Sequence, residues 1–480
     1  MKNHHLLLLP VIFLLAGTYG HAQFTVSGEF RPRLEYRDGY TRLRDSSQSP
    51  YVDILGRNRI LFDFMNEKFT TRFSLQHAFV FGENNFSSDT ITRNTVNIFE
   101  AWFRYSFTRG FAIKAGRMDL SYDDQRLIGS SNWRQWGATH DLVMLQWEVK
   151  KAGYTGDLGF AINNTAPAQA FLSSYTMKNY KYMAYLWQQK KFFDDKLTLS
   201  LLAIMDINQR PNLKTPWSKV TGTDTLPVFN TQDSIIGYAI VPIITTGTTI
   251  ETFPNALYAR GTIGGNIWFG HKNLSLFGNG FYQFGSLSDG RKVSSWFYSA
   301  IVAYRIVKAL KIQVAWEQFS GNNYSDTTDQ KQRSTGFCSL WGSSHNFYGY
   351  MDMFSAYVPT GNHAGLNDLW VRAVVNFTEK TYLEATYRWF SMGYGYLPAK
   401  VIKPGDLPYQ EVKKSLGSEI DLMLVYKPWP NVEVNGAYCI FLPTQTMEIY
   451  DGLKPGTSKW AQYAYIMVTY KPVFFNSDKH

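Results

Sequence analysis

The 480-residue chain is almost devoid of cysteine, with only Cys338 and Cys439. Two cysteines exclude a disulfide-stapled scaffold and a multi-cysteine zinc framework. The two lie far apart in the sequence, which leaves open whether they pair or stay free. The chain also lacks an internal apolar run long enough for a membrane-spanning helix. Its mean hydropathy of −0.25 is too low for a bundle of such helices.

Motifs of catalysis and of nucleotide binding are missing as well. The sequence contains no G-x-S-x-G elbow, no Walker loop and no H-E-x-x-H. His77 and His140 are isolated, while His345 and His363 share one long connection without a recognised metal-ligand spacing, so surface histidines are the better interpretation. We therefore predict a protein that is not an enzyme and that needs no cofactor or metal.

The only long apolar run stands at the N-terminus. Lys2, His4 and His5 precede the apolar residues 6–16, and Gly20-His21-Ala22-Gln23 resembles a small-residue cleavage site. This pattern predicts an export signal over residues 1–22, with a mature domain over 23–480. An N-terminal membrane anchor is the alternative interpretation, but the run is short for a spanning helix.

Aromatic residues are abundant and make up 16% of the chain. They recur in segments where apolar and polar residues alternate. In the first such segment, Val26, Gly28, Phe30, Pro32, Leu34 and Tyr36 alternate with Ser27, Glu29, Arg31, Arg33, Glu35 and Arg37. In a later one, Phe99, Ala101, Phe103 and Tyr105 alternate with Glu100, Arg104 and Ser106. Successive side chains of a strand point to opposite faces, so these segments read as strands with one apolar face.

About 18 such segments follow one another, most of them long enough to cross a membrane as tilted strands. They lie near residues 24–37, 52–66, 68–81, 96–107, 111–121, 140–150, 157–163, 181–190, 197–206, 257–270, 274–285, 295–307, 311–320, 367–377, 381–392, 417–427, 432–441 and 460–474. Tight turns alternate with long polar connections, of which 207–256 and 321–366 are examples. Outer-membrane barrels show this alternation, with short periplasmic turns and long outer loops.

These features predict an all-β fold: a single antiparallel transmembrane barrel of about 18 strands in the outer membrane of a Gram-negative-type bacterium. The apolar face meets lipid and lipopolysaccharide, and the charged face lines the interior. Aromatics near strand ends are expected in the interfacial girdles, namely Tyr36, Phe107, Trp389, Tyr426, Trp460 and Phe474. A soluble secreted β-sheet protein is the alternative, but it leaves many exposed aromatics unexplained.

Three blocks of the sequence resemble one known family. The first is the stretch 113–129, IKAGRMDLSYDDQRLIG, followed by Trp133, Trp136 and Asp141. The second runs from Phe337 to Asp368, and the third comprises 416–422 with Gly436 and Tyr438. Their order and spacing resemble the alginate-export family of outer-membrane channels, with Met118 replacing a usual polar residue. The resemblance implies an 18-stranded barrel and passive passage of an anionic polysaccharide through a basic pore.

Candidate transport residues are charged side chains on the inferred interior face. Guanidinium groups bind carboxylates through paired hydrogen bonds, and several weak sites still let an anion leave. The expected pore-lining residues are Arg31, Arg33, Glu35, Arg57, Arg59, Asp63, Arg72, Glu100, Arg104, Arg117, Asp119, Arg126, Glu384 and Arg388. Arg117 and Asp119 also belong to the resembling stretch. Arg126, Arg134 and Asp141 belong either to a loop folded into the pore or to the surface.

We therefore predict passive diffusion or export of an alginate-like polysaccharide or of other small anions. A general porin whose mixed charges merely keep the lumen wet is one alternative. An outer-membrane enzyme or a receptor that uses its long loops is another. The formal charge of +10 is assigned to the pore rather than to nucleic acid. A periplasmic export partner is left open.

Overall fold

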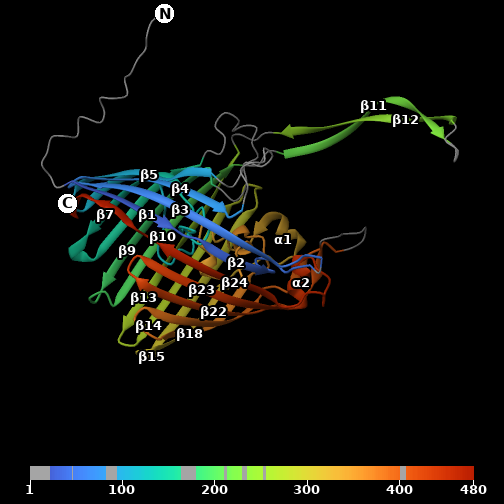
Figure 1. The fold of residues 1–480 in the computed structure, drawn as a ribbon. Helices are drawn as coiled ribbons and strands as arrows, with labels where there is room; N and C mark the ends of the chain where they lie inside the picture. The colour runs from blue at the N-terminus through green and yellow to red at the C-terminus, as the bar shows by residue number, and fades with distance from the viewer. Residues whose placement is uncertain are drawn as a thin grey trace, which may run out of the picture.

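The computed structural model describes residues 22–45, 47–82, 95–163, 180–209, 213–229, 235–251, 256–399 and 407–479. The predicted export signal therefore lies almost wholly outside the described residues. The chain folds as a closed antiparallel barrel of 18 strands, as predicted (Figure 1). No helix in the described ranges is long and apolar enough to cross a membrane.

Each predicted segment corresponds to a strand of the barrel, and neighbours in sequence are neighbours in the sheet. The barrel strands are β1 (Gln23–Phe30), β2 (Arg33–Asp38), β3 (Tyr51–Met65), β4 (Phe69–Val80), β5 (Thr95–Thr108), β6 (Phe111–Met118), β7 (His140–Val149), β8 (Tyr154–Ile162), β9 (Tyr182–Phe192), β10 (Leu197–Gln209), β13 (Leu257–His271), β14 (Leu274–Ser286), β15 (Lys292–Val307), β16 (Leu310–Phe319), β18 (Leu366–Asn376), β19 (Thr381–Ser391), β22 (Ser415–Trp429), β23 (Val432–Pro443), β24 (Ala461–Tyr470) and β25 (Val473–Asn476). Arg31 and Pro32 divide the first strand into β1 and β2, and β24 continues as β25. The barrel closes where β1 and β2 pair with these last two strands.

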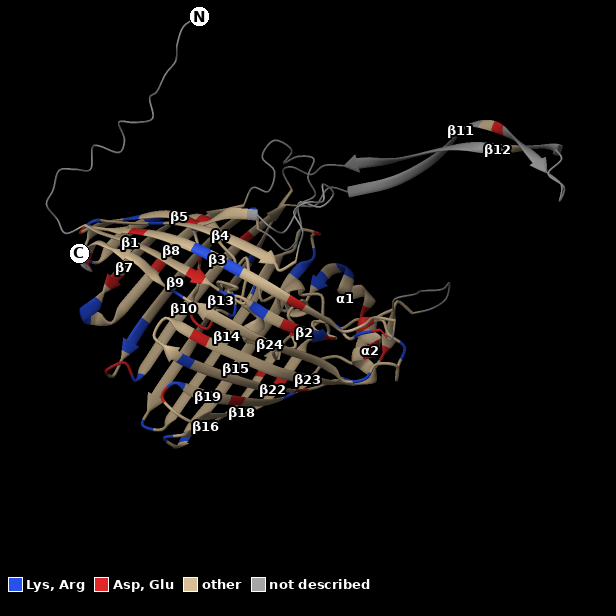
Figure 2. Ribbon diagram, in the orientation of Figure 1, with Lys and Arg blue, Asp and Glu red and all other residues tan. Residues whose placement is uncertain are grey.

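The two faces of the wall follow the predicted alternation. Phe30, Leu34 and Tyr36 point outward, while Glu29, Arg31, Arg33 and Glu35 are buried on the interior side. Backbone groups in lipid must all be paired, and only a closed sheet meets this need with strands. In Figure 2, Lys and Arg colour several short turns, and charged residues also colour stretches within strands such as β3.

One strand departs from the prediction at Phe99. The register between β4 and β5 shifts between Ser74 and Leu75, so β5 carries a bulge at Phe99. A bulge adds one residue to a strand and reverses the facing of the residues beyond it. Phe99 is therefore buried inside the barrel, under the guanidinium of Arg59, whose Cζ lies 3.6 Å from the ring centroid. Its predicted place on the lipid face is wrong.

The long connections take two different courses. Segment 207–256 contains a separate hairpin that extends away from the barrel in Figure 1. Segments 119–139 and 321–365 instead supply buried side chains that pack against the inner wall. Besides the barrel strands, the described elements are β11 (Leu213–Phe229), β12 (Ile235–Glu251), β17 (Arg333–Ser334), β20 (Tyr396–Pro398), β21 (Tyr409–Glu411), α1 (Thr327–Gln332), α2 (Gln445–Asp451), η2 (Lys150–Ala152), η4 (Ser344–Asn346), η5 (Val358–Thr360) and η6 (Ser477–Lys479).

The hydrophobic core lies within the barrel rather than around it. Phe354 of the second inward segment packs on Phe390 of β19, with ring centroids 4.5 Å apart. Tyr348 of the same segment contacts Phe319 of β16 at 5.5 Å. An 18-stranded barrel is too wide for wall side chains alone to fill. The inward segments supply the missing apolar contacts along one side of the lumen.

Replacing Phe73 by Arg is expected to impair assembly of the barrel. Phe73 is exposed on the outer face of β4, where a charged side chain near the bilayer midplane costs about 2–4 kcal/mol. Heat-modifiable migration in gels after folding into lipid vesicles would measure the loss, and Phe73→Leu is the matched apolar control. Equal folding yields for the two variants would contradict the assignment of this face to lipid.

Candidate functional site

The segment between β6 and β7 lies inside the barrel. Its backbone carbonyl oxygens accept hydrogen bonds from arginines on the inner wall. Residues 131–137 form two consecutive turns, in which the Arg134 N–H donates to the Ser131 carbonyl and the Gly137 N–H donates to the Arg134 carbonyl. Gly137 has a φ of +63°, and a Cβ there would lie 2.8 Å from the Phe99 ring. Only glycine allows so close an approach at this conformation.

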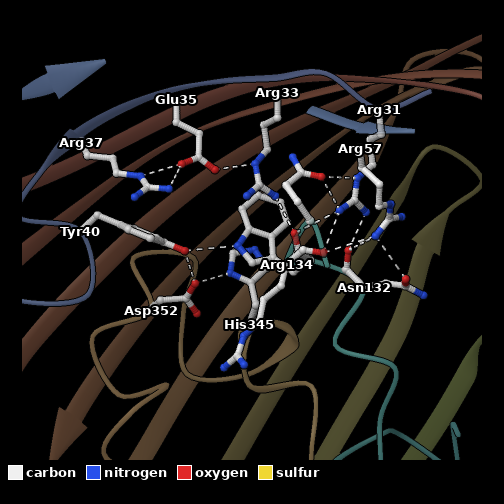
Figure 3. Close-up of polar contacts among 12 residues, drawn as sticks. Arg31, Arg33, Glu35, Arg37, Tyr40, Arg57, Asn132, Arg134, His345 and Asp352 are labelled. Carbon is white, nitrogen blue, oxygen red and sulfur yellow. Dashed lines mark hydrogen bonds and ion pairs between the residues drawn. The ribbon is translucent and has the colours of Figure 1, made fainter. Parts of the chain in front are cut away.

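Arg31 and Arg57 hold this segment against the first strands (Figure 3). Arg31 donates to the carbonyl oxygens of Asn132 at 2.5 Å and Arg134 at 3.0 Å, and to the Gln135 side chain at 2.9 Å. Arg57 donates to Glu29 at 2.6 Å and to the same two carbonyls at 3.3 Å. Hydrogen bonds from a charged donor contribute about 1.5–3 kcal/mol each.

This arrangement corrects the predicted role of the arginine group. Arg31, Arg33, Arg57 and Arg59 do point inward, as predicted, but all four are buried, with Arg57 only 2% exposed. Arg33 also borders a cavity of the lumen. Carbonyl oxygens of the inward segment accept from Arg31, Arg33 and Arg57, and Arg59 donates to the side chains of Gln76 and Asn132, so these four side chains are mostly engaged. They anchor the segment that narrows the lumen.

Trp133 links the first inward segment to the second. The Arg33 guanidinium lies 3.8 Å from the Trp133 ring centroid, and His345 stacks on the indole with centroids 3.7 Å apart. His345 Nδ1 lies 2.8 Å from the Asp352 carboxylate, which also accepts a hydrogen bond from the Tyr40 hydroxyl. Burial and the Asp352 carboxylate raise the pKa of Tyr40 well above its usual value, so the hydroxyl stays protonated and donates.

Arg126 fixes the first inward segment to the opposite wall. Its guanidinium lies 2.7 Å from the Glu317 carboxylate of β16 and 3.5 Å from the Phe347 ring centroid of the second segment. Neighbouring Asp124 accepts from Asn279 of β14 at 2.9 Å. Burial raises the pKa of Asp124. Arg126 therefore belongs to the part of the loop folded into the barrel, which settles one of the alternatives left open by the sequence.

Most other predicted residues lie on the interior wall in ion pairs. Arg72 pairs with Asp63 at 2.7 Å and reaches Glu100 at 3.4 Å, and Arg104 donates to Gln146 at 3.0 Å. Glu384 pairs with Arg372 at 3.5 Å, Arg388 pairs with Asp368, and Glu35 pairs with both Arg33 and Arg37. Because each ion pair joins a positive and a negative side chain, these pairs leave no large excess of charge of either sign on the wall.

Arg117 does not line the pore. It lies on the outer face of β6, with its side chain 46% exposed, and forms a two-pronged ion pair at 2.8 Å with Asp141 of β7. Strand β6 ends at Met118, so Asp119 does not share the strand face of Arg117. Asp119 instead lies near Arg59 and Glu100, and burial together with Glu100 raises its pKa to about 7.

The histidine and cysteine assignments also change with the structure. His140, His345 and His363 are buried rather than on the surface. Burial lowers the pKa of His363 to about 4. Cys338 and Cys439 are free buried thiols. Among the residues that the structure describes, no group of three or more His, Cys, Asp or Glu side chains could hold a metal ion.

Two of the cavities in the described part of the chain lie inside the barrel. A cavity of about 750 Å³ lies toward the long connections and is lined by Arg37, Asp53, Asn97, Arg134 and Trp136, among others. A cavity of about 490 Å³ reaches the short turn at Lys196 and is lined by Arg126, Phe347, Arg372 and Arg388. The inward segments contribute to both cavities, so they form the constriction between the two ends of the lumen.

Arg134 is the exposed cation of the first cavity. Its side chain is exposed and, within the described ranges, has no ion pair. Its position in the sequence was compatible with either the pore or the surface. Tyr40, Asp352 and Gln135 were missed altogether, because a polar side chain in a long loop has no periodicity that predicts its contacts.

Comparisons with known proteins agree with this architecture. The family model described as "Alginate export" matches residues 22–435. No curated protein matches the chain. Among solved structures, Acinetobacter baumannii OccAB4 is 9% identical with a TM-score of 0.58, covering 94% of this chain and 98% of that one. Pseudomonas aeruginosa OprD is 10% identical with a TM-score of 0.57 and 96% coverage of each chain. Pseudomonas aeruginosa OpdK, solved with vanillate, is 10% identical with a TM-score of 0.55, covering 95% and 99%.

Proposed function

Because the chain belongs to the alginate-export family and has a porin-like barrel, it is an outer-membrane channel, and we propose that it passes anionic solutes by diffusion. The solutes are alginate-like polyuronates or smaller organic anions. The mature chain begins after residue 22 and meets outer-membrane lipid and lipopolysaccharide with its apolar band. No catalytic step is part of this function.

The observation that carries the proposal is the unpaired guanidinium of Arg134 in the larger cavity. Every other lumen arginine named above is engaged by a carboxylate, a side-chain amide or a carbonyl oxygen, so its charge is largely offset. A free guanidinium beside a constriction attracts an anion and lowers its barrier to passage. OpdK, whose fold is similar, was solved with vanillate, an aromatic carboxylate, and this supports an organic anion as the solute.

Replacing Arg134 by Ala is expected to lower the anion-to-cation permeability ratio without unfolding the barrel. The side chain is solvated, so its removal leaves no buried partner unpaired. Reversal potentials across planar bilayers in a KCl gradient measure the ratio, and Arg134→Lys should retain most of it. Arg117→Ala is the matched control, since it removes a guanidinium from the outer face. The proposal is contradicted if the parent channel has no anion preference, or if the parent and Arg134→Ala have equal permeability ratios. Either result would support the alternative of a general porin.

A further inference from the structure

An indole exposed to water stands two residues after Arg134. Trp136 is 61% exposed, although it belongs to a segment held firmly inside the barrel. Its carbonyl oxygen accepts a hydrogen bond from Gln76 of β4 at 3.0 Å, and Gly137 fixes the next turn against Phe99. The backbone of Trp136 is thus held in place, and this exposed residue lines the cavity of about 750 Å³.

Trp133, in the same segment, differs from Trp136 because neighbouring side chains cover its ring. Arg33 covers one part of that ring at 3.8 Å, and His345 stacks on it at 3.7 Å. In the described part of the chain, no aromatic or cationic side chain covers Trp136 in this way. Leaving a large apolar ring in water forgoes favourable burial. Segment 131–137 therefore contains one tryptophan that packs and one that offers its face to the lumen.

We propose that Trp136 and Arg134 form a subsite for a sugar acid, which deepens and rests on the anion-channel function proposed above. The indole stacks on the apolar C–H face of a pyranose ring, and the guanidinium binds the ring's carboxylate through paired hydrogen bonds. Asn97 lines the same cavity and supplies an amide group for a hydroxyl. A concave site with an aromatic face and a few polar groups is the usual form of a small-molecule site.

Arg134 and Trp136 have different roles in this subsite. Arg134 attracts any anion, because charge acts at a distance and without regard to shape. Trp136 favours only solutes with a flat apolar face, so it distinguishes a uronate from chloride or citrate. Both contacts are open to water, which keeps each of them weak enough for the solute to move on.

The test uses the full mature chain in planar bilayers, with trigalacturonate as the probe and citrate and maltotriose as comparators. Trp136→Ala is expected to weaken blockade by trigalacturonate about tenfold. Blockade by citrate and the reversal potential in KCl should stay close to those of the parent. Trp136→Phe should recover much of the blockade because it keeps an aromatic face. Trp460→Ala removes an indole of similar exposure, 55%, immediately before β24 and is the matched control.

The outcomes separate this proposal from the channel function itself. Trigalacturonate blockade that survives Trp136→Ala, in a channel that stays anion-selective, overturns the subsite alone. The same holds if maltotriose blocks the parent as well as trigalacturonate does, because the carboxylate then contributes nothing. A simultaneous loss of citrate blockade and anion selectivity in Trp136→Ala also counts against stacking, since it means that the segment has moved. A parent without anion selectivity overturns the proposed function.

Discussion

The triple variant Arg31→Met, Arg57→Met, Glu29→Gln is expected to conduct several-fold more current than the parent while keeping its barrel. Arg31 and Arg57 together donate to the carbonyl oxygens of Asn132 and Arg134. Without these charge-assisted bonds, residues 131–137 keep only the contacts of Arg33, Arg59 and Gln76 with the first strands, and we expect the segment to loosen. Methionine keeps an unbranched apolar stem like that of arginine, and the change at Glu29 avoids a buried carboxylate without a partner.

Single-channel conductance in planar bilayers measures this effect, and hydrogen exchange of residues 131–137 reports release of the segment. The matched control is Arg372→Met with Glu384→Gln, which removes an interior ion pair of 3.5 Å that belongs to the wall alone. The control should conduct like the parent. A triple variant with parental conductance and a protected segment would show that the arginines do not anchor the constriction.

Arg126→Met is expected to give the largest loss of stability. Arg126 and Glu317 are both buried and lie 2.7 Å apart. Removing one partner of a buried ion pair typically costs about 3–5 kcal/mol, because the other charge is left without compensation. The Phe347 ring also loses the guanidinium that lies 3.5 Å from its centroid. Urea-induced unfolding from lipid vesicles measures the change in free energy.

A second substitution separates the contribution of the ion pair to stability from that of the packing around it. Arg126→Met with Glu317→Gln should recover much of the lost stability, because no unpaired charge remains. The Gln side chain still accepts the hydrogen bond that Trp370 Nε1 donates at 3.1 Å. Arg117→Ala breaks an exposed pair and should cost only about 0–1 kcal/mol. Equal losses for Arg126→Met and Arg117→Ala would contradict the buried role of Arg126.

The alternation of polar and apolar residues along each strand correctly predicted which side chains face inward at most positions. Arg31, Arg57, Glu100 and Arg388 all lie on the predicted face, because a strand leaves each side chain only two directions. The prediction failed at Phe99, where a bulge changes the period by one residue. It failed at Arg117 for a different reason. That residue shares the outward face of Ile113, so the alternation places it outside the lumen, whereas its motif and charge favour the interior.

The sequence by itself determined the barrel, its strand number and the facing of most wall residues, since these depend on local alternation and on the need to pair every backbone group in lipid. Only the tertiary structure decided which of the inward charges meet water. Arg31 finds its carbonyl partners about a hundred residues away, in a segment whose sequence carries no periodic signal. Arg134 and Trp136 remain open to the cavity because Arg31 and Arg57 use the carbonyl oxygens of their segment. Such contacts join distant parts of the chain. From the sequence alone, an arginine can therefore be a buried anchor or an exposed binding residue equally well.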